Sequence, residues 1–191
     1  MSGARATARP LVGVLVGGAG RRMGGAAKGL LVAPTGESIV ARWRALCAAT
    51  GLDCVLVGNA QAYADLGMPA IADAAAGAGP LGGVVALMRV RPTEPVIAVA
   101  CDMPRVTAPL LARLAAAAPD APATAPRRAD RWEPLFARYD SARVLAIAER
   151  HLAAGKLSLQ ELLTVAGAQP LALDDGEWAL LEDWDEPGDR R

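Results

Sequence analysis

Short apolar runs alternate with segments of helical spacing over the first two thirds of the chain. Continuous apolar runs of this length are typical of strands buried on both faces. Most of them end at a glycine or an aspartate. The predicted strands are 11–16, 54–58, 95–102 and a short edge piece at 70–72. Ser38 is a plausible N-cap for a helix whose apolar residues recur at helical spacing as far as Gly51.

Further helical spacing is found between and after these strands. It predicts a helix within 80–90 after an opening proline and glycines, one at 110–118 after a cap at Thr107, and others at 142–154 and 159–165. Alternation of strand and helix predicts an α/β fold with a mostly parallel sheet that is covered on both faces. From Pro119 the pattern becomes rich in proline, alanine and arginine, and the apolar runs near 133–140 and 170–184 are left unassigned.

Composition narrows the class of protein. The chain has 191 residues, 53% of them hydrophobic, so residues 1–191 suit one domain. Its 20 basic and 20 acidic residues cancel, so there is no basic field of the kind that binds nucleic acid. No apolar stretch is long enough to span a membrane. Three unpaired cysteines (Cys47, Cys54 and Cys101) favour buried thiols in the reducing cytoplasm, and the lone His151 argues against histidine-based catalysis.

A glycine-rich segment follows the first strand. Gly17, Gly18 and the glycines after them would let backbone amides approach an anion, and Arg22 and Lys28 could neutralise phosphates. A dinucleotide-binding G-x-G-x-x-G motif fails, because Met23 stands where its third glycine belongs. A P-loop fails as well, because Lys28 is not followed by serine or threonine. A plain glycine turn with exposed arginines is the alternative.

Carboxylates follow the apolar runs at three places. Asp102 is the last residue of the run at 95–102. There it could hold Mg²⁺, or it could simply cap the next turn. Asp183 and Asp185 stand two residues apart near the end of the chain. One of them could be a second metal ligand, or both could belong to a solvated acidic tail. Asp73 precedes the glycine stretch 79–83, where backbone could approach a ligand.

In this order the motifs resemble the molybdenum cofactor guanylyltransferase family, the MobA-like NTP transferases. The resemblance spans nearly the whole chain. Its motifs are L-x-G-G-x-x-x-R-M-G-x-x-x-K at 15–28, an aspartate before G-P-L-x-G at Asp73 and 79–83, C-D-x-P at 101–104, E-P-L-F-A-R-Y at 133–139 and S-L-x-x-L-L at 158–163.

The resemblance implies a three-layer, Rossmann-like fold as in nucleotide-diphospho-sugar transferases, with a nucleotide-binding part at 9–118 and an acceptor-binding part at 119–191. It implies Mg²⁺-dependent transfer of GMP from GTP to molybdenum-loaded molybdopterin, with a molybdoenzyme chaperone or a molybdenum-insertion protein as a partner. The implied catalytic residues are Arg22, Lys28 and Asp102, and the implied metal ligands are Asp102 and Asp185. The implied nucleotide contacts are Leu15, Val16, Gly17, Gly18, Lys28, Asn59, Asp73, Gly79, Pro80, Leu81 and Gly82.

Some positions depart from the family pattern. Asp183 and Asp185 replace the family's final N-x-N, as in the cytidylyltransferases for the same cofactor, whereas the 79–83 and 101–104 motifs favour guanine. Gly58 occupies the place of a base-contacting asparagine, so that role passes to Asn59. Three alternatives stay open: an enzyme that uses CTP, an enzyme that acts on a sugar phosphate, and a GTP-binding accessory protein without catalytic activity.

Overall fold

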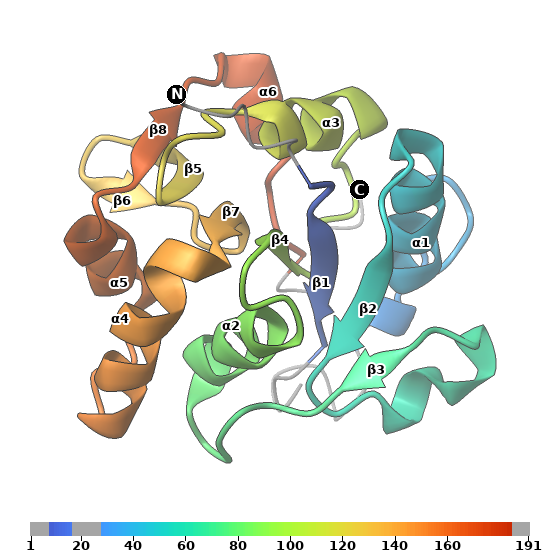
Figure 1. Cartoon of the computed structure of the whole chain (residues 1–191). Helices are drawn as coiled ribbons and strands as arrows, with labels where there is room; N and C mark the ends of the chain where they lie inside the picture. Colours follow the sequence, from blue (N-terminus) through green and yellow to red (C-terminus); the bar gives the residue numbers. More distant parts are fainter. Residues whose placement is uncertain (1–7, 17–27, 185–191) are drawn as a thin grey trace.

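The first apolar run forms β1 (Leu11–Leu15), an inner strand whose five residues are all buried. It pairs in parallel with β2 (Cys54–Val57) on one side and with β4 (Pro95–Ala100) on the other. The edge strand β3 (Ala70–Ile71) pairs in parallel with β2. The computed structural model describes residues 8–16 and 28–184, and Figure 1 shows how these strands lie side by side.

The second half of the chain extends the same sheet beyond β4. β7 (Phe136–Asp140) runs antiparallel to β4, and β5 (Ala123–Arg128) runs antiparallel to β7. β5 also pairs with β6 (Arg131–Trp132), antiparallel, and with β8 (Gln169–Leu171), parallel. β7 runs antiparallel to β5 because only a short connection joins the two strands, and a parallel pair would need a long crossover segment.

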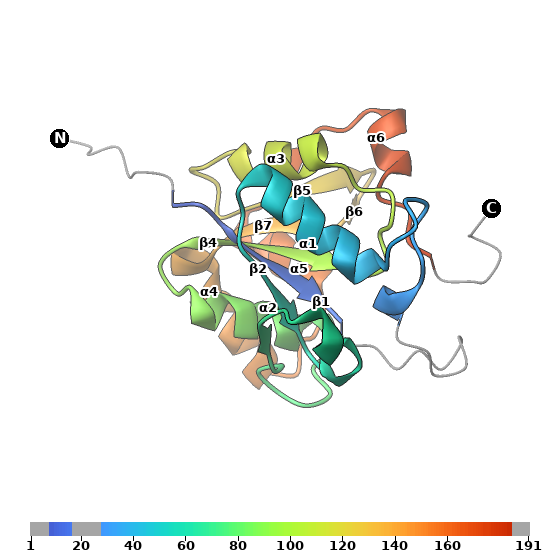
Figure 2. The same cartoon turned by 90° about the vertical axis from the view of Figure 1, so that its right-hand side faces the viewer.

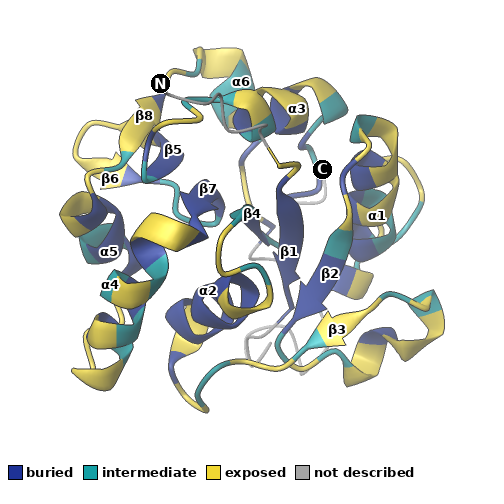
Figure 3. Cartoon of the chain, viewed as in Figure 1, coloured by how far each residue is buried: buried dark blue, intermediate teal, exposed yellow. Residues whose placement is uncertain are grey.

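Helices cover both faces of the sheet, which makes three layers (Figures 1 and 2). α1 (Ile39–Thr50) and α3 (Ala108–Ala116) pack on one face, together with residues of the chain end that follows α6 (Asp175–Ala179). On the other face lie α2 (Gly79–Val90), α4 (Ser141–Ala153) and α5 (Leu159–Ala166). Figure 3 shows that their inner sides are buried and their outer sides exposed.

Local signals in the sequence explain where these helices begin and end. The Ser38 hydroxyl accepts a hydrogen bond from the Ala41 amide at 3.2 Å, and Gly51 ends α1 in the left-handed conformation with φ of 68°. α2 packs closely on β1 through Gly13, since a Cβ built there would lie 2.4 Å from Cδ2 of Leu87. The sequence therefore encodes both the helix limits and the close approach of helix to sheet.

The predicted fold class is confirmed: a mixed α/β sheet with a parallel core and flanking helices. All predicted strands and helices are present, and their ends agree with the predicted ones to within two residues. The unassigned apolar runs form β7, β8 and the short α6, and the proline-rich stretch contains β5. In the described part of the chain no helix is both long and apolar enough to cross a membrane.

Candidate functional site

The carboxyl ends of β1, β2 and β4 meet at one edge of the sheet. Leu15 lies opposite both Val57 and Ala100, so the segments that follow these strands emerge next to one another. In sheets of this type, ligands bind beyond the carboxyl ends of the parallel strands. We therefore expect the predicted nucleotide and metal contacts at this edge.

Lys28 and Asp102, which the sequence predicted as catalytic residues, lie in contact at this edge. The Lys28 ammonium is 3.2 Å from Oδ2 of Asp102, although 74 residues separate them. Their side chains are 26% and 17% exposed, so the pair is accessible from solvent without being fully hydrated. Lys28 begins the short helix η2 (Lys28–Leu30), and Asp102 follows β4. The structure thus brings the first and second predicted motifs together.

The acidic chain end returns to the same place. The amide of Trp184 donates to the carbonyl of Asp102 at 2.9 Å, and Arg105 pairs with Glu182 at 2.6 Å. The neighbouring Asp183 is therefore carried towards Asp102, as the sequence suggested. Asp185, the other predicted ligand, lies outside the described residues, as do Gly17, Gly18 and Arg22.

Glu133 is a further carboxylate here that the sequence did not single out as an ionisable group. Burial raises the pKa of its carboxyl above the ordinary value, and the negative charges of Asp183 and Asp102 raise this pKa further. A hydrogen bond from the Leu135 amide works in the opposite direction. Its position directly after β6, three residues before β7 begins, was the available signal.

Asp73 lies against the beginning of α2. The amide of Ala74 donates to the carbonyl of Gly82 at 3.1 Å, and a Cβ built on Gly83 would be 3.3 Å from Oδ1 of Asp73. Partial burial raises the pKa of the Asp73 carboxyl. A side chain at Gly83 would therefore crowd the aspartate, and it would also meet Leu15 and Val57 at 3.2 Å. The predicted residues Gly79, Pro80, Leu81 and Gly82 form the first turn of this helix.

Leu15, Val16 and Asn59 occupy the neighbouring strand ends. The Leu15 and Val16 side chains are buried, so these residues can present only backbone to a ligand. Asn59 is exposed, and its Oδ1 accepts a hydrogen bond from the Gln61 amide at 3.2 Å. Asn59 therefore lies at the predicted edge with one of its polar atoms already engaged.

Tyr63 links the loops of this edge and was missed by the sequence analysis. It belongs to η3 (Gln61–Leu66), is only 3% exposed, and its hydroxyl accepts the Gly29 amide at 3.2 Å. A Cβ on Gly29 would lie 2.5 Å from Val40 and 3.0 Å from this tyrosine ring. Burial, helped by nearby Cys101, raises the pKa of Tyr63 to about 12. The residue after Lys28 is thereby fixed.

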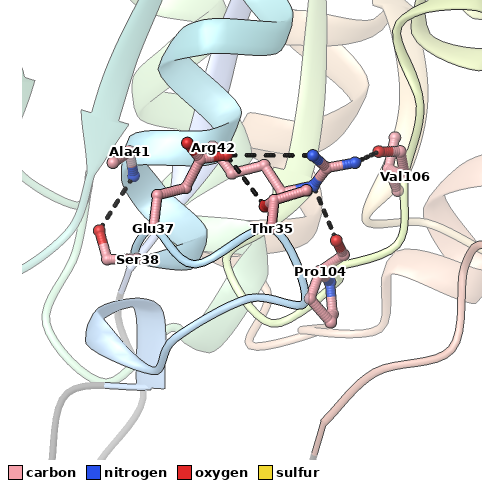
Figure 4. Close-up of polar contacts among 7 residues, drawn as sticks. All are labelled: Thr35, Glu37, Ser38, Ala41, Arg42, Pro104 and Val106. Carbon is pink, nitrogen blue, oxygen red and sulfur yellow. Dashed lines mark hydrogen bonds and ion pairs between the residues drawn. The ribbon is translucent and has the colours of Figure 1, made fainter.

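Arg42 was also missed, because nothing in its helical context marks it. From α1 it donates Nε to the carbonyl of Pro104 at 2.8 Å and Nη2 to the carbonyl of Val106 at 2.7 Å. Figure 4 shows the guanidinium reaching across to this loop, with Glu37 beside it at 4.0 Å. Both acceptors lie in the segment that carries Asp102.

Three arginines of the predicted acceptor-binding part, Arg127, Arg128 and Arg131, stand on the β5–β6 hairpin. Arg127 lies over the Trp132 ring at 4.8 Å from its centre and pairs with Asp130 at 3.4 Å. Arg128 lies over Trp178 at 4.9 Å and pairs with Asp175. These contacts hold two of the cations in place while leaving them exposed.

The donors at this edge limit which metal could bind. Among residues 8–16 and 28–184, no group of three or more His, Cys, Asp or Glu side chains is arranged to hold an ion. Mg²⁺ is usually bound by one or two carboxylates together with water and substrate phosphates. Asp102 has the hard oxygen donors that such a shared site needs, so the residues fit Mg²⁺ bound jointly with a nucleotide.

Comparison with known proteins finds relatives of one family. Residues 12–173 match the model of the MobA-like NTP transferase domain. A molybdenum cofactor guanylyltransferase of Pseudomonas putida GB-1 is 38% identical over 173 residues, which cover 87% of this chain and 88% of the relative. A probable molybdenum cofactor guanylyltransferase of Opitutus terrae is 32% identical over 195 residues, covering 97% and 95%.

A solved structure shares the architecture as well. The molybdopterin-guanine dinucleotide biosynthesis protein A of Archaeoglobus fulgidus superposes with a TM-score of 0.76 at 25% identity. The match covers 94% of each chain. It therefore includes the β5–β8 region as well as the parallel half of the sheet.

Proposed function

Since the chain belongs to the MobA-like NTP transferase family, we propose that it is a nucleotidyltransferase that moves GMP from GTP to the terminal phosphate of molybdopterin. The product is the guanine dinucleotide form of the molybdenum cofactor. Relatives named guanylyltransferases, matched over most of their length, support both the reaction class and the choice of base. The contact between Lys28 and Asp102 is the structural observation that carries the proposal.

In this proposal the nucleotide lies along the strand ends. The backbone of Leu15 to Gly18 would meet the guanine, with Asn59, Asp73 and the first turn of α2 at the base and ribose. α2 has no side-chain hydrogen bond at its N-cap, so its first amides can face a polar ligand. Arg22 and Lys28 would hold the triphosphate through charge-assisted hydrogen bonds.

Asp102 would bind Mg²⁺ together with phosphate oxygens, and Asp185 would complete the ligand set. The ion would supply charge neutralisation at the phosphates. Lys28, now paired with Asp102, would exchange this partner for the nucleotide's phosphates. A carboxylate and an ammonium in contact thus mark the place where metal and triphosphate would meet.

The reaction needs little from the protein besides positioning. An oxygen of the molybdopterin phosphate, already ionised at neutral pH, attacks the α-phosphorus of GTP and forms the new P–O bond. The bond to the β-phosphate breaks in line, and pyrophosphate leaves with its electron pair. No general base is required, so orientation and charge stabilisation suffice. The segment 133–140 and the β5–β6 hairpin would hold the acceptor, and a chaperone or insertion protein would receive the product.

The direct test is pyrophosphate release by purified protein with Mg²⁺ and molybdenum-loaded molybdopterin, comparing GTP, CTP and ATP. We expect turnover with GTP and little with the other two. Preference for CTP would keep the mechanism and change the base. Binding of GTP without any release would instead support an accessory protein.

Asp102→Asn is the variant that tests the metal site. We expect it to fold normally and to lose at least about 100-fold in turnover, because the amide cannot replace the carboxylate as a ligand for Mg²⁺. Asp53→Asn is a matched control, since Asp53 is exposed at the opposite end of β2. Equal activity of the two variants would refute the assignment of Asp102.

A further inference from the structure

We infer that Arg42 is a positioning residue, which holds the loop after β4 so that the Asp102 carboxylate stays at the reaction site. This inference rests on the proposed function, because it gives Asp102 a catalytic task. Arg42 itself touches neither Asp102 nor Lys28 through any of its hydrogen bonds, which go to the carbonyls of Pro104 and Val106. Its effect on the reaction is therefore indirect.

The two hydrogen bonds are strong ones of their kind. Their lengths of 2.8 and 2.7 Å are typical of charge-assisted contacts, and the two nitrogens are fixed relative to each other by the planar guanidinium. The side chain is only 16% exposed, so solvent weakens these bonds less than on an open surface. Two carbonyls, two residues apart, are thereby held from a single point.

The backbone at Arg42 is held rigidly because α1 packs against the core. Val40 and Trp43, the neighbours of Arg42 in the helix, are 0% and 1% exposed and belong to the core on this face. Figure 4 shows Arg42 reaching from the first turns of α1, near the Ser38 cap, to the loop. Because the core fixes α1, Arg42 holds the segment that follows Asp102 in a fixed position.

Two further contacts hold this loop at Asp102, and Arg105 pairs with Glu182 nearer its other end. Lys28 pairs with the Asp102 carboxylate, and the Trp184 amide binds the Asp102 carbonyl. When a nucleotide takes over Lys28, one of these two restraints is released. Arg42 would then keep the loop in place while phosphate and metal bind, since its acceptors are not part of the exchange.

Loss of Arg42 should therefore affect turnover more than nucleotide affinity. A shift of about 1 Å in a catalytic group can lower the rate by about 100-fold. We expect Arg42→Met to reduce kcat roughly 10- to 100-fold, with the KM for GTP changed less than about threefold. The Mg²⁺ concentration for half-maximal rate should rise, because the ligand is held less firmly. Arg42→Lys should recover part of the loss by contacting one carbonyl.

Arg44→Met is the matched control. Arg44 lies on the same helix and also donates to a backbone carbonyl, that of Leu66 at 2.9 Å, but on η3 instead of the Asp102 loop. We expect its kcat and Mg²⁺ requirement to equal those of the wild type. Thermal denaturation of each variant establishes that it is folded at the assay temperature.

Hydrogen exchange gives a readout that does not depend on activity. The amides of residues 101–103, 105 and 106 should exchange faster in Arg42→Met than in the wild type, and at the wild-type rate in Arg44→Met. An active wild type with an equally active Arg42→Met would overturn the inference alone. A wild type inactive with every nucleotide would overturn the proposed function, and unchanged exchange at 101–106 would overturn the restraint of the loop itself.

Discussion

At the scale of single residues, each buried tyrosine makes a hydrogen bond that holds a loop segment, Tyr63 across 34 residues and Tyr139 across five. Tyr63 accepts the Gly29 amide, and Tyr139 donates its hydroxyl to the Pro134 carbonyl at 2.8 Å. Both side chains are at most 3% exposed. Burial raises the pKa of each phenol, that of Tyr63 to about 12 and that of Tyr139 further. The neutral phenols are thus part of how the two segments are held.

This shift predicts how the protein responds to alkali. Each native pKa lies above the ordinary value of about 10, so the stabilisation is complete below about pH 10 and is lost as pH rises through the native pKa. The chain has only these two tyrosines, so the tyrosinate absorbance reports on them alone. In a spectrophotometric titration we expect no tyrosinate near pH 10 in the folded protein and a normal titration in urea. Ionisation of a folded tyrosine near pH 10 would contradict the buried geometry.

At the scale of elements, the apolar runs predicted the parallel half of the sheet, because a strand buried on both faces needs continuous hydrophobicity. β5 was not predicted, since its sequence includes Pro126 and two arginines, which strands seldom favour. Pairing with β7 and β8 overrides this preference, and the Pro126 carbonyl still accepts the Glu133 amide at 2.8 Å. Tertiary contacts that the local sequence does not contain decided this strand.

The same distinction holds for the site. Lys28 and Asp102 could be predicted because each follows a parallel strand, and strand ends meet at one edge. Arg42 could not, because its acceptors lie 62 and 64 residues away and any arginine on a helix surface has the same local pattern. Tyr63 was hidden in the same way, since its role depends on where Gly29 comes to lie.

The contact between α2 and β1 offers a test at the scale of elements. Gly13→Ala places a methyl group against Leu87, which is fully buried and has little room to move. We expect a loss of about 1–3 kcal/mol in the free energy of unfolding. Leu87→Ala alone should cost about 2–5 kcal/mol through its cavity. Because the new methyl group partly fills that cavity, the double variant should lose less than the sum, as measured by urea denaturation. Strict additivity would show that helix and strand are not in tight contact here.

At the scale of the whole molecule, the end of the described chain returns to the candidate site. The first strand leads into the glycine-rich segment, and the last described residues return to the loop of Asp102. Trp184 is 5% exposed and packs into the core on the α1 and α3 face, while its amide binds Asp102. The stability of this core and the geometry of the site are therefore linked through one residue.

Trp184→Ala tests this link. Removal of a buried indole should lower the free energy of unfolding by about 3–5 kcal/mol, and about 2–4 °C per kcal/mol is expected for a protein of this size. The backbone amide remains in the variant, so any loss of activity at a temperature where it is folded reflects a looser chain end. We expect a higher Mg²⁺ requirement as well as a lower Tm.

Glu182→Gln is the control for the same experiment, because it changes a surface contact and leaves the core intact. It breaks only the pair with Arg105, which involves a 61% exposed carboxylate, and exposed pairs contribute at most about 1 kcal/mol. Its Tm and Mg²⁺ requirement should therefore stay close to those of the wild type. If Trp184→Ala lowers the Tm but leaves the Mg²⁺ requirement unchanged, the chain end only packs against the core. A change in both quantities, absent from Glu182→Gln, means that the buried indole also sets the position of Asp102.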